Sequence, residues 1–163
     1  MAYLSNMKKD LINNVIYFLS FFLLVTLINK LFSFSYWPLY LGGIVGMILP
    51  NLDHLLYSFV FKPFELTSIR IKALIAEKRY KEAIMFLYAT KEERKDLIFH
   101  SLNFQLIFAV LAFWVVSSSG NLFGKGLVLG FSLSEAVFVY KNISDKKFFW
   151  ASALILLVLG IMM

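Results

Sequence analysis

The chain has no cysteine and little charge. Among its 163 residues, Asp, Glu, Lys and Arg together make up 16%, against about 25% in soluble domains. The missing cysteine excludes a disulfide framework, a thiolate zinc site and a cysteine nucleophile. Hydrophobic residues are 60% of the chain, and the mean hydropathy is +0.76. This composition excludes a soluble globular domain and a disordered chain, and it indicates a single integral membrane domain over residues 1–163.

Five segments are apolar and long enough to be transmembrane helices, since about 20 residues cross a hydrocarbon core of about 30 Å. They cover residues 11–28, 39–61, 97–116, 122–140 and 148–163. The fourth segment is the most interrupted, because Lys125 and Glu135 lie within it. We therefore expect an all-α integral membrane protein, a bundle of about five transmembrane helices.

The distribution of positive charge predicts the orientation, because Lys and Arg accumulate on the cytoplasmic side of membrane proteins. With a cytoplasmic N-terminus, five crossings leave only Lys30 and Lys125 outside, and the opposite orientation inverts this. The sequence thus predicts a multi-pass protein of the cell (inner) membrane, with its N-terminus in the cytoplasm and its C-terminus outside. The sequon at residues 142–144 would then face the cytoplasm and would not be glycosylated.

Residues 62–96 form the one long polar stretch of the sequence. Thr67 or Ser68 is placed to cap a first helix, a break follows near Arg79, and a second helix covers residues 81–89. Apolar residues recur on one face of each helix. This cytoplasmic amphipathic hairpin has two alternative placements. Either it lies on the inner leaflet with its basic side toward anionic headgroups, or it is a solvated loop packed on the bundle.

Four ionisable side chains lie inside the predicted spans, where each costs about 2.5–3.5 kcal/mol at the bilayer centre. Asp53 and His54 are in the second span, His100 is in the third and Glu135 is in the fourth. At about 1.5 Å per residue, the predicted topology places all four in one layer just below the cytoplasmic surface. Pro50 disturbs the helix beside this layer, because it lacks a backbone donor. The string PNLDH therefore predicts the wall of a polar pocket.

Two carboxylates and two imidazoles form a suitable ligand set for Zn²⁺, Mn²⁺ or Fe²⁺. We expect a divalent metal, Zn or Mn, held by Asp53, His54, His100 and Glu135, where it would activate a water molecule. Asn103, one helical turn from His100, would orient that imidazole. Two alternatives remain open. Asp53 could form a hydrogen-bonded pair with His54 or His100 without a metal, or the four polar residues could never meet.

Two of these strings resemble motifs of the YdjM-type membrane-bound metal-dependent hydrolases. Residues 46–54, GMILPNLDH, are similar to the family's Gly-x-x-x-Pro-Asp-x-Asp-His element, with Asn51 in place of the first acid. Residues 97–102, LIFHSL, match the end of its His-Arg-Gly-x-Thr-His-Ser element through His100 and Ser101. The resemblance spans most of residues 40–140.

The sequence also departs from the family's pattern. Lys95 and Asp96 stand in place of the His-Arg pair, and Ser134 and Phe138 stand where a third element, Ser-His-x-x-x-Asp, has its His and Asp. Glu135 would have to substitute for these missing ligands. The departures favour an alternative function, in which a degenerate, non-catalytic family member serves as a structural or complex subunit.

The resemblance implies a helical membrane bundle and a metal-dependent hydrolase with Asp53, His54 and His100 in its site. Its substrate would be a phosphoester or a lipid-like molecule at the cytoplasmic face. A further hypothesis is a proton- or ion-handling protein with Asp53 and His100 as a relay. No nucleic-acid partner is expected, because the basic residues of the polar stretch alternate with acids and follow a membrane span.

Two Gly-x-x-x-Gly motifs, Gly42/Gly46 and Gly126/Gly130, allow helices to approach closely. The contact could form inside one chain, or it could support oligomerisation. The lipid bilayer is the one partner that the composition itself requires.

Overall fold

The computed structural model describes residues 2–94, 97–142 and 146–163, which form helices joined by short turns, with no β-strand. Three helical runs are long and apolar enough to cross a membrane: Met7–Asn29, Phe34–Phe61 and Leu122–Lys141. The apolar helices Asn103–Ser118 and Trp150–Ile161 are shorter. The all-α prediction is confirmed for the described residues, whereas a bundle of five spans is not confirmed.

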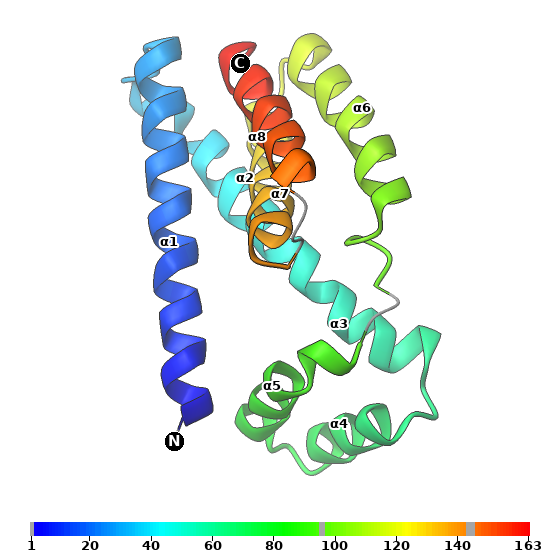
Figure 1. The fold of residues 1–163 in the computed structure, drawn as a ribbon. Coiled ribbons are helices and arrows are strands. Elements are labelled where there is room, and N and C mark those ends of the chain that lie inside the picture. The colour runs from blue at the N-terminus through cyan, green and yellow to red at the C-terminus, as the bar shows by residue number, and fades with distance from the viewer. Residues whose placement is uncertain (1, 95–96, 143–145) are drawn as a thin grey trace.

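The first predicted span lies within α1 (Ala2–Asn29), the long helix that runs along one side of the molecule (Figure 1). Lys30 follows in the left-handed conformation, with φ 55°, and ends the helix. Most apolar side chains of α1 are exposed. Such a helix needs an apolar environment on its uncovered sides, which is what a bilayer supplies.

The second predicted span is one helical run with changing pitch. It passes through α2 (Trp37–Ile48), the 3₁₀ turn η2 (Leu49–Leu52), α3 (Asp53–Leu56) and the π-helical turn η3 (Tyr57–Phe61). Pro50 lies inside the 3₁₀ turn and is buried, as its missing N–H group predicts. The predicted disturbance of the helix at Pro50 is therefore confirmed, and Asp53 opens the next helical turn. The short turn η1 (Phe34–Tyr36) precedes the run.

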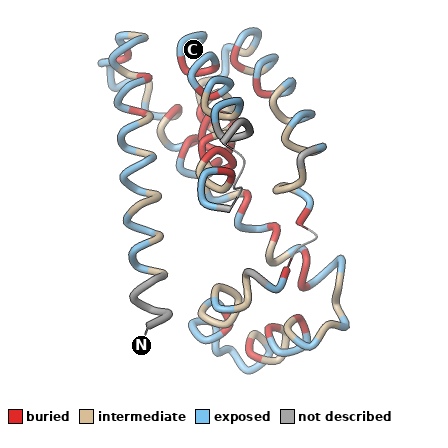
Figure 2. The backbone as a smooth tube through the Cα atoms, viewed as in Figure 1, coloured by how far each residue is buried: buried red, intermediate tan, exposed pale blue. Residues whose placement is uncertain are grey.

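The closest helix pair joins α2 to α7 (Leu122–Asn142) through glycines. A Cβ atom at Gly46 would overlap the backbone of Leu127, and one at Gly130 would overlap the backbone of Gly43. Both Gly-x-x-x-Gly motifs therefore serve contacts inside one chain, the first of the two predicted alternatives. Figure 2 shows that buried residues gather along this crossing.

Two shorter helices flank α7. They are α6 (Leu102–Ser118) and α8 (Lys146–Ile161), the third and fifth predicted spans. The third predicted span starts at Leu97, whereas helix α6 begins at Leu102, where Ser101 caps it by accepting the Phe104 N–H at 3.3 Å. His100 thus precedes the helix, and its predicted helical neighbour Asn103 does not lie one turn from it on a common helical face.

The predicted hairpin is confirmed as α4 (Leu66–Ala76) and α5 (Tyr80–Ala89), followed by the turn η4 (Lys91–Glu93). Its turn contains Lys78 in the left-handed conformation, with φ 60°. The predicted cap is wrong, because α4 begins after Glu65 without a side-chain cap and Ser68 is buried inside it.

The hairpin lies at the end of the molecule that holds the N-terminus (Figure 1). There α4 contacts η3, and α5 contacts α1. The hairpin therefore packs on the protein, and its placement on the inner leaflet stays a prediction. The predictions for residues 95–96 and for the sequon beyond residue 142 fall outside the described residues.

Candidate functional site

Asp53 is a fully buried carboxylic acid at the start of α3, with 0% of its surface exposed. Its Oδ2 accepts the backbone N–H of Phe99 at 2.6 Å, and its Oδ1 has no hydrogen-bond partner among the described residues. Buried polar atoms are nearly always paired, because an unpaired one loses its hydration without compensation. One carboxylate oxygen is therefore left available for a proton, a water molecule or a ligand.

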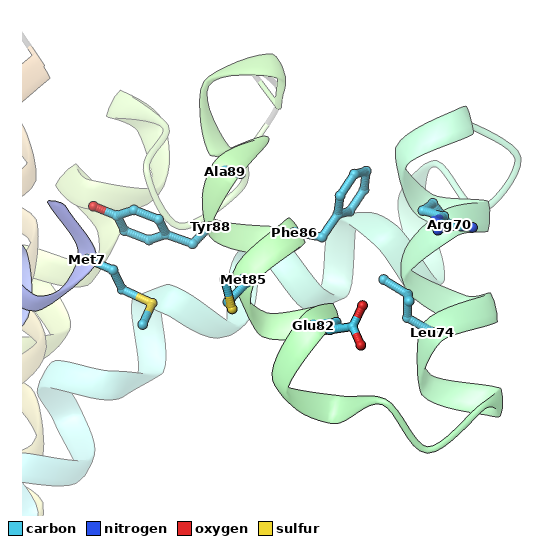
Figure 3. A pocket seen from close by; sticks show the side chains of 8 residues that line it. All are labelled: Met7, Arg70, Leu74, Glu82, Met85, Phe86, Tyr88 and Ala89. Carbon is cyan, nitrogen blue, oxygen red and sulfur yellow. The ribbon is translucent and has the colours of Figure 1, made fainter. Parts of the chain in front are cut away.

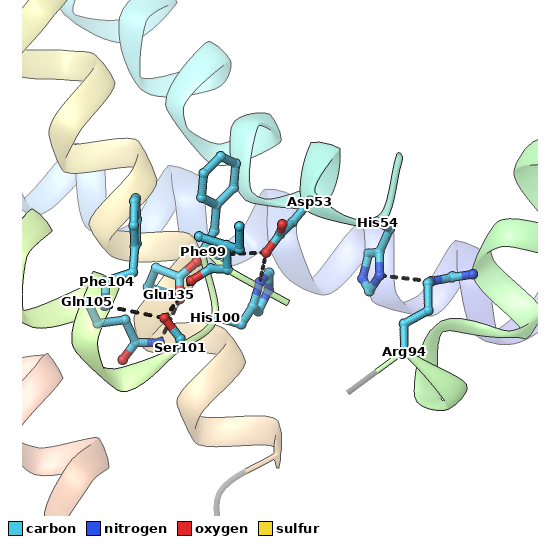
Figure 4. Close-up of polar contacts among 10 residues, drawn as sticks. Asp53, His54, Arg94, Phe99, His100, Ser101, Phe104, Gln105 and Glu135 are labelled. Carbon is cyan, nitrogen blue, oxygen red and sulfur yellow. Dashed lines mark hydrogen bonds and ion pairs between the residues drawn. The ribbon is translucent and has the colours of Figure 1, made fainter. Parts of the chain in front are cut away.

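His100 lies beside this carboxylate. Its Nδ1 is 3.6 Å from Asp53 Oδ2, which brings the pair into contact although the distance is longer than a hydrogen bond. The imidazole side chain is only 10% exposed. The ring of Phe138 packs against it edge-on, with ring centroids 4.0 Å apart. The structure thus brings together two of the four residues that the sequence predicted to meet (Figure 4).

His54 adjoins the pair but faces a residue that the sequence analysis did not single out. Its ring centroid is 6.1 Å from that of His100, and its Nδ1 accepts a hydrogen bond from Arg94 Nε at 3.3 Å. A guanidinium can only donate, so Nδ1 must carry the lone pair and a neutral ring keeps its proton on Nε2. In this arrangement neither nitrogen of His54 is free to bind a cation.

Arg94 is almost completely buried, with 3% exposed, between the hairpin and α3. It also donates to Thr90 Oγ1 at 3.0 Å and to the carbonyl oxygen of Leu87. Burial lowers the pKa of Arg94, yet a guanidinium stays protonated in proteins. No sequence pattern indicates this role, because the contacts of Arg94 depend on how the hairpin folds back.

Glu135 is buried in α7, with 6% exposed. Its Oε2 accepts a hydrogen bond from Gln105 Nε2 at 2.8 Å, and its Oε1 has no partner among the described residues. Figure 4 shows Glu135 on the side of His100 that faces away from Arg94. Glu135 therefore lies near His100, but its hydrogen bond goes to Gln105.

A cavity of about 940 Å³ opens beside these residues at the hairpin end of the molecule. It lies between α1, the Pro50 turn, α5 and α7, and its volume is in the range of small-molecule sites, about 300–1,000 Å³. Its polar lining includes Asn51, His54, Arg94, His100, Ser101 and Ser134. The predicted polar pocket at the PNLDH string is therefore present.

A charged cluster around Asp10 forms another part of the cavity wall. The Asp10 carboxylate accepts the hydroxyl of Tyr88 and forms ion pairs at 3.3 Å with Lys91 and with Lys141. These contacts join α1, the hairpin and the end of α7. The cluster therefore ties the hairpin to the bundle across the cavity.

A second cavity, of about 290 Å³, separates α5 from α4 and the start of α1 (Figure 3). Its lining is mainly apolar and includes Met7, Leu74, Met85 and Phe86. The hairpin thus leaves its interior loosely filled at this point. The titratable groups of the Asp53 site are not part of this lining.

The predicted metal ligands are only partly convergent. Among residues 2–94, 97–142 and 146–163, no three His, Asp or Glu side chains lie close enough together to hold a metal ion. Asp53 and His100 are in contact, but His54 is occupied by Arg94 and Glu135 by Gln105. The side chains as arranged do not fit a metal site, and metal binding at these residues stays a prediction.

Comparison of the chain with family models, curated protein sequences and solved structures finds no match in any of the three. The likeness to the YdjM-type hydrolases therefore rests on the quoted motifs alone. Two of them are located in the structure: the PNLDH string forms the 3₁₀ turn and opens α3, and the HS pair precedes α6.

Proposed function

We propose that this chain is an integral membrane hydrolase that acts on a phosphoester or lipid-like ester at the cytoplasmic face. The observation that carries the proposal is the buried Asp53–His100 pair beside a large polar cavity. In ligand sites a few convergent polar groups in a concave, mostly apolar surface fix the orientation of the ligand. Buried acids paired with a histidine at such a cavity are typical of proton transfer.

The proposed topology keeps five crossings, with the N-terminus and the hairpin in the cytoplasm. Three helical runs have the required length and apolarity. The 17 residues of α6 span only about 25 Å at about 1.5 Å per residue, so this helix would cross upright in a locally thinned bilayer. The charge bias supports the orientation, because the basic hairpin then lies inside.

In the proposed reaction His100 is the general base. Asp53 Oδ2 lies 3.6 Å from Nδ1. Once this distance closes to a hydrogen bond, Asp53 would hold the proton on Nδ1, so that Nε2 can take a proton from water. The resulting hydroxide attacks the phosphorus, the bond from phosphorus to the leaving oxygen breaks, and His100 returns its proton to that oxygen. A positioned acid–base group of this kind contributes about 10²–10⁴-fold to the rate.

The test uses purified protein in lipid nanodiscs with a chromogenic phosphomonoester, a phosphodiester and a carboxylic ester. We expect turnover of at least one phosphoester, with kcat reduced about 10²-fold or more in His100→Gln and Asp53→Asn. Glu77→Gln, the same acid-to-amide change on the exposed hairpin turn, is the matched control. Turnover that survives in His100→Gln would contradict the proposal.

The same assay tests the predicted metal. Wild-type protein is treated with a chelator, then reloaded with Zn²⁺ or Mn²⁺, and bound metal is counted. Less than about a tenth of an equivalent after loading would remove the metal prediction and leave the Asp53–His100 reaction intact. Near-stoichiometric metal that is lost in Asp53→Asn would support the metal prediction with Asp53 as a ligand.

One observation favours the second candidate, a non-catalytic membrane subunit. Phe138 occupies a position where the resembled family has an acid, and its ring packs directly against His100. An aromatic ring there covers one side of the imidazole and cannot act as an acid or a ligand. This candidate predicts no turnover of any ester in the wild type, and a cellular phenotype that His100→Gln leaves unchanged.

A further inference from the structure

Arg94 is a buried positive charge that forms no ion pair with a described acid, although Glu93 and Glu65 lie near enough to attract it. Its hydrogen bonds go to His54 Nδ1, the Thr90 hydroxyl and the Leu87 carbonyl, all neutral acceptors. A guanidinium has five N–H donors, so two of them have no partner in the described part of the chain. Since Arg cannot lose its proton, it cannot escape the cost of burial by becoming neutral.

Uncompensated buried charge of this kind is costly, and proteins normally pair it with an acid or a ligand. The nearby acids do not form a close pair with it. Glu93 is exposed and attracts Arg94 only from beyond ion-pair distance. Glu65 accepts the Tyr57 hydroxyl and pairs with Lys62, and Asp53 accepts the Phe99 N–H. The open side of Arg94 is the cavity, which it lines. A compensating anion would therefore have to come from the cavity.

The other charged side chains on the cavity wall also leave a surplus of positive charge there. Asp10 is the one carboxylate in the described lining, and it is shared by Lys91 and Lys141. Three cationic side chains thus face one acid, and the surplus is positive when both histidines are neutral. The Ser134 hydroxyl, which also lines the cavity, can donate to an anion as well.

We propose that Arg94 is the centre of an anion subsite that binds the phosphate group of an amphiphilic phosphoester. A guanidinium fork matches phosphate oxygens, and the cavity at the hairpin end is where a lipid headgroup would enter. His54 lies between Arg94 and the Asp53–His100 pair. The subsite deepens the proposed function by naming its substrate class, although binding does not require turnover.

The primary test measures lipid binding by native mass spectrometry of the wild type in detergent. The probes are phosphatidic acid, phosphatidylglycerol and phosphatidylcholine of equal chain length, and glycerol 3-phosphate as a soluble phosphate. We expect the two anionic lipids to bind about tenfold or more tightly than phosphatidylcholine. Binding of glycerol 3-phosphate with equal affinity would assign the site to a free phosphate ester instead of a lipid headgroup.

Substitution then locates the site. Arg94→Gln is expected to lower affinity for the anionic lipids about tenfold, and Arg94→Lys, which keeps charge but loses the fork, to have a smaller effect. The matched control is Arg79→Gln, an exposed arginine already paired with Glu77 and Glu82. Equal losses in Arg94→Gln and Arg79→Gln would show a general charge effect and overturn the subsite.

A second measurement does not depend on lipid affinity. Because the chain has no cysteine, Ser134→Cys places a single thiol in the cavity wall, and Ser117→Cys places one on the exposed opposite end. We expect anionic thiosulfonate reagents to react faster than cationic ones with the thiol at Ser134→Cys, but not with the thiol at Ser117→Cys. This preference should disappear in the Arg94→Gln background, and a preference that persists there would contradict the proposal.

The outcomes for binding and for catalysis are separable. Asp53→Asn should lose turnover while keeping the preference for anionic lipids, because it leaves Arg94 unchanged. If instead no variant turns over any ester but Arg94→Gln still loses lipid binding, the hydrolase proposal fails and the anion subsite stands. If Arg94→Gln does not fold, the thiol measurement on Arg94→Lys and on the wild type with added lipid decides.

Discussion

The two ends of the molecule are built on opposite principles. At the end away from the hairpin, α2 and α7 meet backbone to backbone through glycines, and Val25, Leu39 and Leu129 are completely buried around them. At the hairpin end the second span changes pitch at Pro50, and the gap between α1, α5 and α7 is a cavity lined by polar side chains. Close packing excludes ligands, whereas irregular backbone opens space for them.

We call the tightly packed α2–α7 end the closed end, and the hairpin end with its cavity the open end. The closed end also explains why the open end can hold buried polar atoms without hydrogen-bond partners. Unpaired polar atoms at Asp53 and Glu135 reduce stability. They are tolerated because the tight α2–α7 contact and the apolar core around it stabilise the bundle elsewhere. If this division is correct, substitutions at the two ends should have different consequences: loss of folding at one and altered binding or access at the other.

The largest effect is expected from Gly130→Leu at the closed end. A Cβ atom there would overlap the backbone of Gly43, which cannot move without separating the helices. Overpacking costs about 1–3 kcal/mol where side chains can adjust, and more is expected where backbone must shift. The measurement is the thermal midpoint and the yield of monodisperse protein in detergent.

Gly120→Leu is the matched control for this substitution, because a Cβ at Gly120 has no atom within 4 Å. It should leave the thermal midpoint unchanged. Similar losses in both variants would show that the added leucine acts on insertion or solubility and not on the α2–α7 contact.

The fold was predictable from the sequence where the residues of one segment determine its structure by themselves. The apolar run of α1, the disturbed helix at Pro50 and the break between α4 and α5 each follow from local composition or from a missing donor. The start of α6 was not predictable in this way. Its preceding residues are apolar enough to be helical, but the Phe99 N–H is drawn to Asp53, a partner 46 positions away.

The candidate site, like the fold, was predictable only in part. Asp53 and His100 are in contact, as the sequence predicted, but His100 reaches Asp53 from the segment before α6 and not from a helix. The Arg94–His54 contact was not predictable, because it depends on the hairpin folding back against α3. The same contact explains why four predicted ligands do not converge: one imidazole has a closer partner.

An intermediate effect is expected from Asp10→Asn, which changes the open end while leaving Asp53 and His100 in place. The ion pairs with Lys91 and Lys141 are lost, although an amide oxygen can still accept the Tyr88 hydroxyl. Partly exposed pairs are worth about 0–1 kcal/mol each. The hairpin should therefore detach from the bundle more often. A thiol at Ser134→Cys should react severalfold faster, because a loss of about 1 kcal/mol raises the population of the detached state severalfold.

The thiol at Ser117→Cys controls for general loosening, and its rate should not change in Asp10→Asn. Equal acceleration at both positions would mean that Asp10 stabilises the whole bundle. In that case the cluster would not be a specific tie between the hairpin and the rest of the molecule.

The smallest effect concerns the hairpin turn itself, where Arg79 donates to Glu82 at 2.9 Å. This hydrogen bond lowers the pKa of Glu82 below its usual value. A lowered folded-state pKa stabilises the turn at every pH above the ordinary glutamate pKa, about 4.3, and the contribution is lost as the pH falls through the lower value. Hydrogen exchange in α5, corrected for its intrinsic pH dependence, should therefore be slower in wild type than in Glu82→Gln from neutral pH down to about pH 5. The difference should vanish in stronger acid.

A difference that persists in strong acid would show that Glu82 stabilises the turn by packing and not by its charge. The cavity should bind its ligand equally well in both proteins, because the turn lies outside the cavity lining.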